Sequence, residues 1–218
     1  MESDAAVELR QKLGAGRRTL AEYTGKKFYY GIKTGLNEAF VIDRGTRDRF
    51  VQQHPASGTM LRPFVQGTHL RPFYIEDSDQ FLITLKSSGD YSWAWSDLDG
   101  NAEKAFAEAF PPVYAHLQEQ REVVSKRSDQ GRYWWELRSC TYWGAFEQSK
   151  IVWPDISKLP RFSMDTENRY LGNTGYIIPG GDYYLLGILS SWATWFFISK
   201  TAQPLRLRGN RWQYRLIA

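Results

Sequence analysis

Short hydrophobic runs, several of them alternating with polar residues, predict the strands of this chain. Residues 27–32 alternate and are rich in aromatic side chains, which predicts a strand, and residues 40–42 are its expected neighbour. Residues 204–216 alternate on both sides of Gly209 and Asn210, a pattern typical of a β-hairpin. Further strands are expected at the end of segment 56–64, in 80–85, at 150–154 and in 174–180.

Helical periodicity fills other parts of the chain. It predicts a helix over residues 4–13 with Ser3 or Asp4 as N-cap, and another over Arg44–Gln53. Residues 102–128 are helical in pattern, with a break at Pro111 and Pro112, and 141–150 contain a further helical turn. The strongest helix is expected at 183–200, where apolar residues on most sides predict burial.

The order of these elements bears on the fold class. Helices and strands follow one another without a regular βα alternation, which favours a mixed α+β fold over a doubly wound sheet. We therefore expect short strands in a mixed sheet packed against helices. The apolar run from Tyr183 is about 17 residues long, at the lower limit for a membrane span, and a buried helix is the preferred interpretation.

Composition adds two constraints. Trp, Tyr and Phe make up 16% of the chain, which is unusually aromatic, and the single cysteine, Cys140, excludes an internal disulfide. A reducing cytoplasm is the simpler compartment for such a chain, and the first residues show no pattern of a signal peptide. We expect a cytoplasmic protein with no membrane partner.

Charge is unevenly distributed along the chain. Residues 26–71 hold eight Lys or Arg against three Asp or Glu, whereas 72–120 hold two against nine. Residues 199–218 hold five basic residues and no acid. This asymmetry indicates a face that meets a polyanion, or equally a set of solvated charged faces.

Several catalytic motifs can be tested and rejected. No glycine-rich phosphate loop follows a strand, and the three histidines are scattered. The segment FPPVY resembles the Asn-Pro-Pro-aromatic motif of amino-methyltransferases, but Phe110 and Val113 occupy its two chemical positions. WPDISK resembles a nuclease metal site, but Ile156 stands where a second carboxylate is needed. We expect no catalytic site in this chain and no transfer of methyl groups by it.

Five segments in order resemble one known family. They are YYGIKTGLNEAFVID from Tyr29, LRPFVQGTHLRPFY, WWELRSCTYWGAFEQSKIVWPDIS, YYLLGILSSWATWFF and LRLRGNRWQYRLIA. Together they resemble the TaqI-like C-terminal specificity domain, the target recognition domain of type IIG restriction-modification enzymes and related adenine methyltransferases. The chain departs from the family pattern at His69, which stands in an acidic position, at Ser149 and at Ser190.

The resemblance covers about residues 23–218 and implies that DNA recognition and catalysis lie in different domains. Residues 1–22 are then a helical lead-in, and 23–218 form a target recognition domain cut from a longer enzyme. The domain's partners are double-stranded DNA and upstream methyltransferase and nuclease domains, and it presents an adenine for flipping. S-adenosylmethionine and Mg belong to the parent enzyme, with no cofactor in this chain.

The first of these segments also carries chemistry of its own. A turn at Lys33, Thr34 and Gly35 offers backbone N–H groups, a hydroxyl and a positive charge, which together suit a phosphate. Asn37 is a candidate for reading adenine through paired hydrogen bonds, although an Asn that caps a turn is the commoner case.

Other candidates come from the later segments. Arg62 and Arg71 flank apolar-Pro-Phe runs and are expected to reach guanine edges or phosphates, or to lie solvated on the surface. Tryptophans 134, 135 and 143 suit stacking on bases, but such tryptophans are more often core. The full set of expected DNA contacts is Lys33, Thr34, Gly35, Asn37, Arg62, His69, Arg71, Trp135, Arg138, Lys150, Arg206 and Arg208.

Two other functional classes fit part of the pattern. An aromatic-rich β domain is typical of carbohydrate-binding modules, whose tryptophans stack on sugars, although these modules rarely carry a basic tail without acids. A protein-interaction domain is the third class. Binding to DNA or heparin that falls with salt distinguishes a nucleic-acid module from both.

Overall fold

The computed structural model describes residues 3–25, 28–207 and 211–215 of the chain. The α-helices within these ranges are α1 (Asp4–Gly14), α2 (Leu20–Thr24), α3 (Asn37–Phe40), α4 (Arg44–Gln53), α5 (Ala102–Ala109), α6 (Pro111–Glu119), α7 (Arg121–Val124), α8 (Trp143–Phe146), α9 (Tyr183–Leu189) and α10 (Trp192–Thr201). Short 3-10 turns lie at η1 (Pro55–Met60), η2 (Gly67–His69) and η3 (Asp99–Asn101). None of the helices in the described ranges is long and apolar enough to cross a bilayer.

The described strands form three sheets. They are β1 (Tyr29–Tyr30), β2 (Val41–Asp43), β3 (Leu61–Val65), β4 (Gln80–Ile83), β5 (Lys150–Pro154), β6 (Ile156–Ser157), β7 (Ser163–Asp165), β8 (Tyr170–Leu171), β9 (Gly175–Pro179), β10 (Gln203–Leu207) and β11 (Arg211–Arg215). One sheet has the order β1-β9-β5-β7, the second β2-β4-β3-β8 and the third β10-β11-β6. Among the pairs of described strands, only β3 and β8 run parallel, so the second sheet is mixed. The expected α+β class with a mixed sheet is confirmed.

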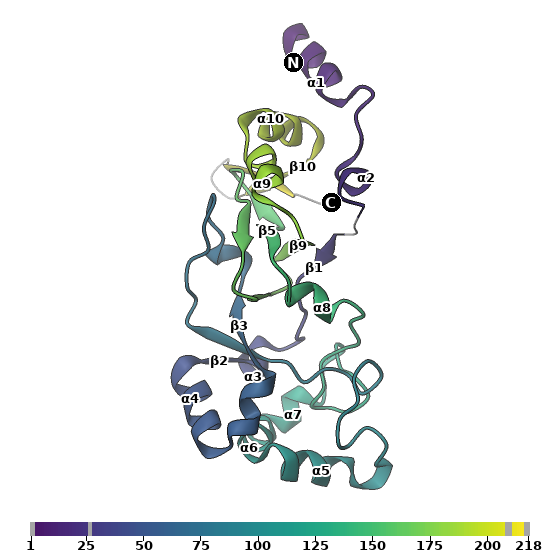
Figure 1. Cartoon of the computed structure of the whole chain (residues 1–218), viewed down its shortest axis with the longest axis vertical. Helices are drawn as coiled ribbons and strands as arrows, with labels where there is room; N and C mark the ends of the chain where they lie inside the picture. The colour runs from purple at the N-terminus through teal and green to yellow at the C-terminus, as the bar shows by residue number, and fades with distance from the viewer. Residues whose placement is uncertain (1–2, 26–27, 208–210, 216–218) are drawn as a thin grey trace.

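The sheet built on β5 separates two hydrophobic clusters. Val152 and Ile177 project into the larger cluster, which includes the second sheet and α3 to α8. Ile151, Trp153 and Ile178 project from the opposite face into a smaller cluster with α9 and α10. Because both faces are covered, these strands are apolar at successive positions instead of alternating. In Figure 1 the molecule is elongated, with α4 to α7 at one end and α1 at the other.

Several helix boundaries follow the sequence signals closely. Ser3 caps α1, as one of the two expected caps, and α4 spans Arg44–Gln53 as predicted, with the Asp43 carboxylate accepting from Thr46 N at 2.7 Å. The break at Pro111 is also confirmed, since α6 begins at that proline. Pro at the first position of a helix loses no hydrogen bond that the helix could have made.

The expected pairing of the first two strands is wrong. Only Tyr29 and Tyr30 of segment 28–32 form a strand, and β1 pairs with β9. Phe40 ends α3, and the strand that follows it, β2, pairs with β4. The short α3 turns the chain out of one sheet and into the other, which a pattern of two neighbouring hydrophobic runs does not reveal.

The expected single buried helix at 183–200 is also corrected. The segment forms two helices, and Ser191 starts the second by accepting from Thr194 N with its hydroxyl at 3.2 Å. One side of the pair is open, since Tyr183 and Tyr184 are each 70% exposed and Trp192 is 74% exposed. The residues of this pair that are fully buried are Leu185, Leu186, Leu189 and Trp195.

Candidate nucleic-acid interface

A close backbone crossing fixes the path of the chain into the turn at residues 33–37. Gly31 N donates to Gly175 O at 2.9 Å, and Ile32 N donates to Leu171 O at 2.7 Å. A Cβ atom on Gly31 would collide with the carbonyl oxygen of Gly172. Because Gly31 has no side chain, segment 31–32 can cross closely over segment 171–175. This crossing places Lys33 at the surface.

The turn itself places its polar groups differently from the sequence expectation. Thr34 is only 2% exposed, and its hydroxyl donates to Asn37 Oδ1 at 2.7 Å and accepts from Leu36 N at 3.2 Å. The hydroxyl thus holds the turn together, and the expectation that Thr34 contacts a phosphate is corrected. Gly35 is exposed with φ of 74°, a left-handed conformation that suits glycine.

Asn37 begins α3 and is half-buried. Its Oδ1 accepts the Thr34 hydroxyl, and a carbonyl oxygen has room for a second hydrogen bond. The side chain therefore helps to close the turn through Thr34, although it does not cap α3, whose N-cap position is Leu36. If Asn37 reads a base, its amide oxygen has to accept a hydrogen bond from the base while it also accepts from Thr34.

Arg127 organises the turn from the interior and was not singled out by the sequence. It is 7% exposed, and its guanidinium donates to Thr34 O at 2.6 Å. The same group donates to four more backbone carbonyls, those of Val124, Asp129, Trp134 and Glu136. Burial lowers the pKa of Arg127 to about 10, so the side chain remains charged at neutral pH.

Asp129 links the two exposed cations beside the turn. Its carboxylate lies 2.9 Å from Lys33 Nζ and 3.4 Å from Arg138 Nη1. Burial tends to raise the pKa of Asp129, but the hydrogen bonds and attraction of Lys33 and Arg138 outweigh it and lower the pKa. The lysine and arginine side chains are 47% and 56% exposed, whereas Asp129 is 11% exposed. Solvent therefore meets a predominantly positive edge.

This edge borders a cavity of about 390 Å³. Its walls include both cations, the Gly31–Ile32 backbone, and the aromatic side chains of Tyr30, Tyr142 and Trp143. Cations beside aromatic walls suit contact with a nucleic-acid backbone or an unstacked base. The structure thus brings together Lys33 and Arg138, which are 105 residues apart in the sequence.

The charge balance of this edge gives a testable prediction. Asp129→Asn removes an acid that competes with phosphates for Lys33 and Arg138. It is expected to raise the affinity for random duplex DNA about 2- to 5-fold at low salt, because ion pairs of solvent-exposed cations are worth up to about 1 kcal/mol. Fluorescence anisotropy with a labelled duplex measures the effect. Glu108→Gln is the matched control, since it removes an acid that pairs with Lys104 on α5 and changes the net charge equally. Equal affinities for both variants would show that Lys33 and Arg138 do not contact DNA.

Arg62, Arg71 and His69 lie around β3 and the loop that follows it. Arg62 lies 3.7 Å from the Glu147 carboxylate, and Arg71 is paired with Glu76 at 2.7 Å. Both arginines remain partly exposed, at 39% and 30%. His69 Nδ1 accepts from Gln66 N at 3.0 Å, so the ring shapes the short η2 turn. Arg62 is the less constrained of the two, because the Arg71 guanidinium is also held by the carbonyls of Thr68 and Leu70.

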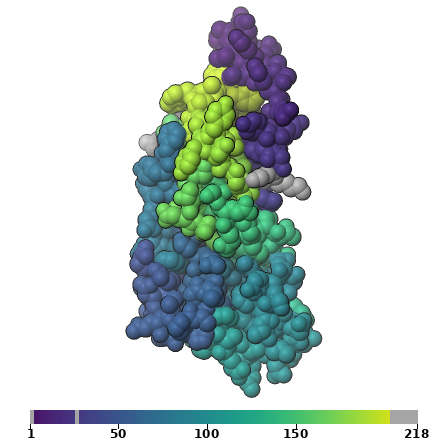
Figure 2. Space-filling view, in the orientation of Figure 1, coloured from purple at the N-terminus to yellow at the C-terminus, as the bar shows by residue number. Residues whose placement is uncertain are grey.

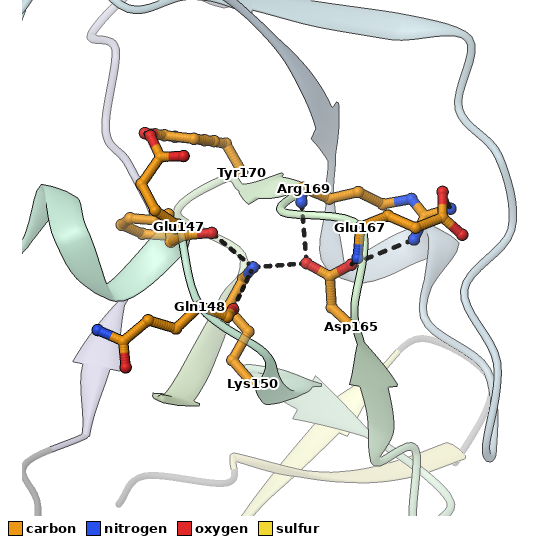
Figure 3. Close-up of polar contacts among 8 residues, drawn as sticks. Glu147, Gln148, Lys150, Asp165, Glu167, Arg169 and Tyr170 are labelled. Carbon is orange, nitrogen blue, oxygen red and sulfur yellow. Dashed lines mark hydrogen bonds and ion pairs between the residues drawn. The ribbon is translucent and has the colours of Figure 1, made fainter. Parts of the chain in front are cut away.

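Lys150 has a different environment from the one expected. It is 0% exposed, and its ammonium lies 2.6 Å from Asp165 Oδ2 and donates to the carbonyls of Phe146 and Gln148. Figure 3 shows this group between the carboxylate and the backbone, with Arg169 on the far side of Asp165. A buried ammonium with these partners does not reach a phosphate, so the expected DNA contact is corrected. Burial lowers the pKa of Lys150, and the attraction of Asp165 opposes that effect.

Trp135 is part of the hydrophobic core. It is 2% exposed and stacks on Phe106 and Tyr133 at ring distances of 5.3 and 4.7 Å. The role of stacking on bases is therefore corrected for this tryptophan. Trp143 is 8% exposed and lines the cavity described above.

Arg206 lies in β10, which pairs with β11 as the predicted hairpin. Arg208 lies outside the described residues. β11 also pairs with β6, so the hairpin continues the third sheet. Among the described residues, no group of three or more His, Cys, Asp or Glu side chains is placed to hold a metal ion.

The class of protein follows from a family match. The model of the TaqI-like C-terminal specificity domain matches residues 62–209, well over half of the chain. The chain therefore belongs to the family of TaqI-like C-terminal specificity domains. The resemblance to this family is confirmed over residues 62–209, whereas the segment from Tyr29 that contains Lys33 and Asn37 lies outside the match.

A solved structure has a similar fold. It is the type IIL restriction-modification enzyme MmeI in complex with DNA, with a TM-score of 0.52 and 18% sequence identity. The match covers 76% of this chain and 20% of the MmeI chain, so this chain spans about a fifth of the length of that enzyme. No curated protein matches the chain.

Proposed function

We propose that this chain binds duplex DNA and reads a specific sequence for a restriction-modification enzyme. In that enzyme, separate catalytic domains methylate adenine and cleave the DNA that this domain positions. The observation that carries the proposal is the family match over residues 62–209. Residues 23–218 are proposed as the recognition domain and 1–22 as a helical lead-in.

The proposed contact set is smaller than the sequence set. Lys33 and Arg138 are assigned to phosphates because they are exposed and share one mostly buried acid. Arg62 and Arg71 are assigned to base edges or phosphates near the loop after β3. Asn37 is retained as a candidate reader of adenine, and the hairpin arginine Arg206 as a backbone contact.

The methyl donor S-adenosylmethionine and the Mg ion are assigned to other parts of the enzyme. No cofactor site is evident among the described residues of this chain. The proposal therefore expects DNA binding from this chain with no methyl transfer and no cleavage. Labelled S-adenosylmethionine and a supercoiled plasmid test the two activities.

Lys33→Ala and Asn37→Ala separate affinity from specificity. Lys33→Ala is expected to weaken binding to every duplex and to reduce the slope of log affinity against log salt by about 0.9, since one phosphate contact is lost. Asn37→Ala is expected to cost about 1–3 kcal/mol on the preferred sequence only. Both are measured by anisotropy over a salt series, on a duplex selected from a randomised pool and on a scrambled one.

Lys104→Ala is the control for the lysine variant, because Lys104 is a 76% exposed cation on α5, outside the proposed contact set. It is expected to bind both duplexes like the wild type. If Asn37→Ala lowers the affinity for selected and scrambled DNA by the same factor, Asn37 does not read a base. Binding that does not change with salt would instead favour a carbohydrate-binding module.

A further inference from the structure

The loop between β3 and β4 exposes two adjacent aromatic side chains. Phe73 is 63% exposed and Tyr74 is 56% exposed, while Leu70 just before them is fully buried. The loop lies along one side of the elongated molecule, beside the sheet that contains β5 (Figure 1). Figure 2 shows this blue segment on the outer surface, next to the green C-terminal elements. Solvent exposure of two neighbouring rings opposes the hydrophobic effect, so it calls for an explanation.

The backbone of Phe73 is strained as well. Its φ is 71°, in the left-handed region that bulky side chains rarely adopt. Two other non-glycine residues in the described ranges have positive φ, Asp79 and Asn168, and short polar side chains of that kind tolerate the conformation. Phenylalanine has no such compensation. Strain of this kind concentrates at functional sites.

The strained conformation is held by a set of hydrogen bonds. Phe73 N donates to Phe162 O at 2.9 Å, and Arg71 N donates to Tyr74 O at 3.0 Å. The buried Ser163 hydroxyl lies 2.5 Å from Arg71 O and 3.0 Å from Tyr74 O. Below the tip, Leu70 and Ile75 form an antiparallel bridge. The loop is therefore a small closed tip whose backbone is fixed while its two rings face outwards.

Basic side chains lie on the tip and on the segment that it contacts, and one acid, Glu76, pairs with Arg71 at 2.7 Å. Arg71 is anchored to it, with its guanidinium donating to the Thr68 and Leu70 carbonyls. The segment that supplies Phe162 also carries Lys158, which is exposed, and Arg161, which is partly exposed. That segment runs from β6, the partner of hairpin strand β11, to β7. An exposed aromatic pair with cations beside it matches the chemistry of a nucleic acid, which combines stacked bases with phosphates.

We propose that Phe73 and Tyr74 form an aromatic wedge that stacks on the bases of the bound duplex, with Phe73 entering a base step. The proposal rests on the proposed function, because it assumes that this chain binds duplex DNA. Apolar side chains inserted at a base step unstack it, and the fixed backbone reduces the entropy lost when the ring is immobilised. The strain at Phe73 then serves to hold the ring away from the protein surface.

Two substitutions at Phe73 test the wedge and separate it from a structural role. Phe73→Asn removes the ring but keeps a residue that accepts positive φ, and Phe73→Gly removes both ring and strain. Both variants are expected to melt at the same temperature as the wild type or higher. Both are expected to lose affinity for a duplex selected by the wild-type chain by about 5- to 150-fold, the range of one base–aromatic stack.

Tyr183→Ala is the matched control, since it removes a 70% exposed aromatic residue from α9. It is expected to bind the selected duplex like the wild type. A second readout uses duplexes with 2-aminopurine at each position in turn. The wild type and Tyr183→Ala are expected to raise the fluorescence at one step, and both Phe73 variants to leave it unchanged.

The outcomes separate the wedge from the DNA-binding role itself. If the wild type binds DNA and the Phe73 variants bind equally well, the wedge is wrong and the proposed function stands. If the Phe73 variants lose affinity together with a lower melting temperature, Phe73 is structural and the wedge is also wrong. If the wild type retains no duplex from the pool, the proposed function itself fails.

Discussion

Lys150→Met is expected to lower the free energy of unfolding by about 3–5 kcal/mol, the range for removing one partner of a buried ion pair. The substitution leaves the Asp165 carboxylate, 1% exposed, without its closest cation, although Arg169 Nη1 remains 3.1 Å away. It also removes the donor from the carbonyls of Phe146 and Gln148. Urea unfolding followed by tryptophan fluorescence measures the loss.

The double variant Lys150→Met, Asp165→Asn sharpens this test. It removes both charges, so it is expected to be more stable than Lys150→Met alone. Lys104→Met, at the exposed lysine on α5, is expected to change the unfolding free energy by less than about 0.5 kcal/mol. A Lys150→Met protein that unfolds like the wild type but loses DNA affinity would contradict the structural role. Lys150 would then be a DNA contact, as the sequence predicted.

Arg127→Met is the second substitution with a large expected effect. Five backbone carbonyls lose their charged donor, and buried hydrogen bonds to charged groups are worth about 1.5–3 kcal/mol each. Some of this loss is offset because a charge no longer has to be buried, so we expect a net cost of about 3 kcal/mol or more. Urea unfolding again gives the value.

Arg127→Lys is the informative companion variant. A lysine keeps the charge but has three donors in one group, so it cannot span carbonyls that the planar guanidinium reaches with three nitrogens. It is expected to fold with a free energy of unfolding between those of the wild type and Arg127→Met. Because Thr34 O loses its anchor, DNA affinity is expected to fall in this variant even at temperatures where it is folded. Unchanged affinity in folded Arg127→Lys would show that the turn is not part of the interface.

The local signals in the sequence predicted the local structure well. The N-cap residue Ser3 and the break at Pro111 fixed helix ends, because capping and the missing proline N–H act within a few residues. The hairpin β10–β11 followed from strict alternation around a turn. The helix break at Ser191 in segment 183–200 was not predicted, because the apolar run continues across it.

The candidate site was less predictable because tertiary contacts decide it. Whether a Lys is exposed, as Lys33 is, or fully buried, as Lys150 is, depends on which strands and loops meet around it. Arg127 and Asp129 lie more than 90 residues from the turn that they hold, and nothing in their local sequence marks that pairing. The strain at Phe73 is a property of φ and is invisible in composition.

Selection from a randomised duplex pool by the chain of residues 1–218 tests the central claim most directly. Bound duplexes are sequenced, and the affinity for the enriched sequence is then measured from low to physiological salt. We predict enrichment of one defined sequence, with log affinity falling linearly against log salt as several phosphate contacts are screened. A pool that stays random, or an affinity that does not change with salt, would contradict a role in reading DNA.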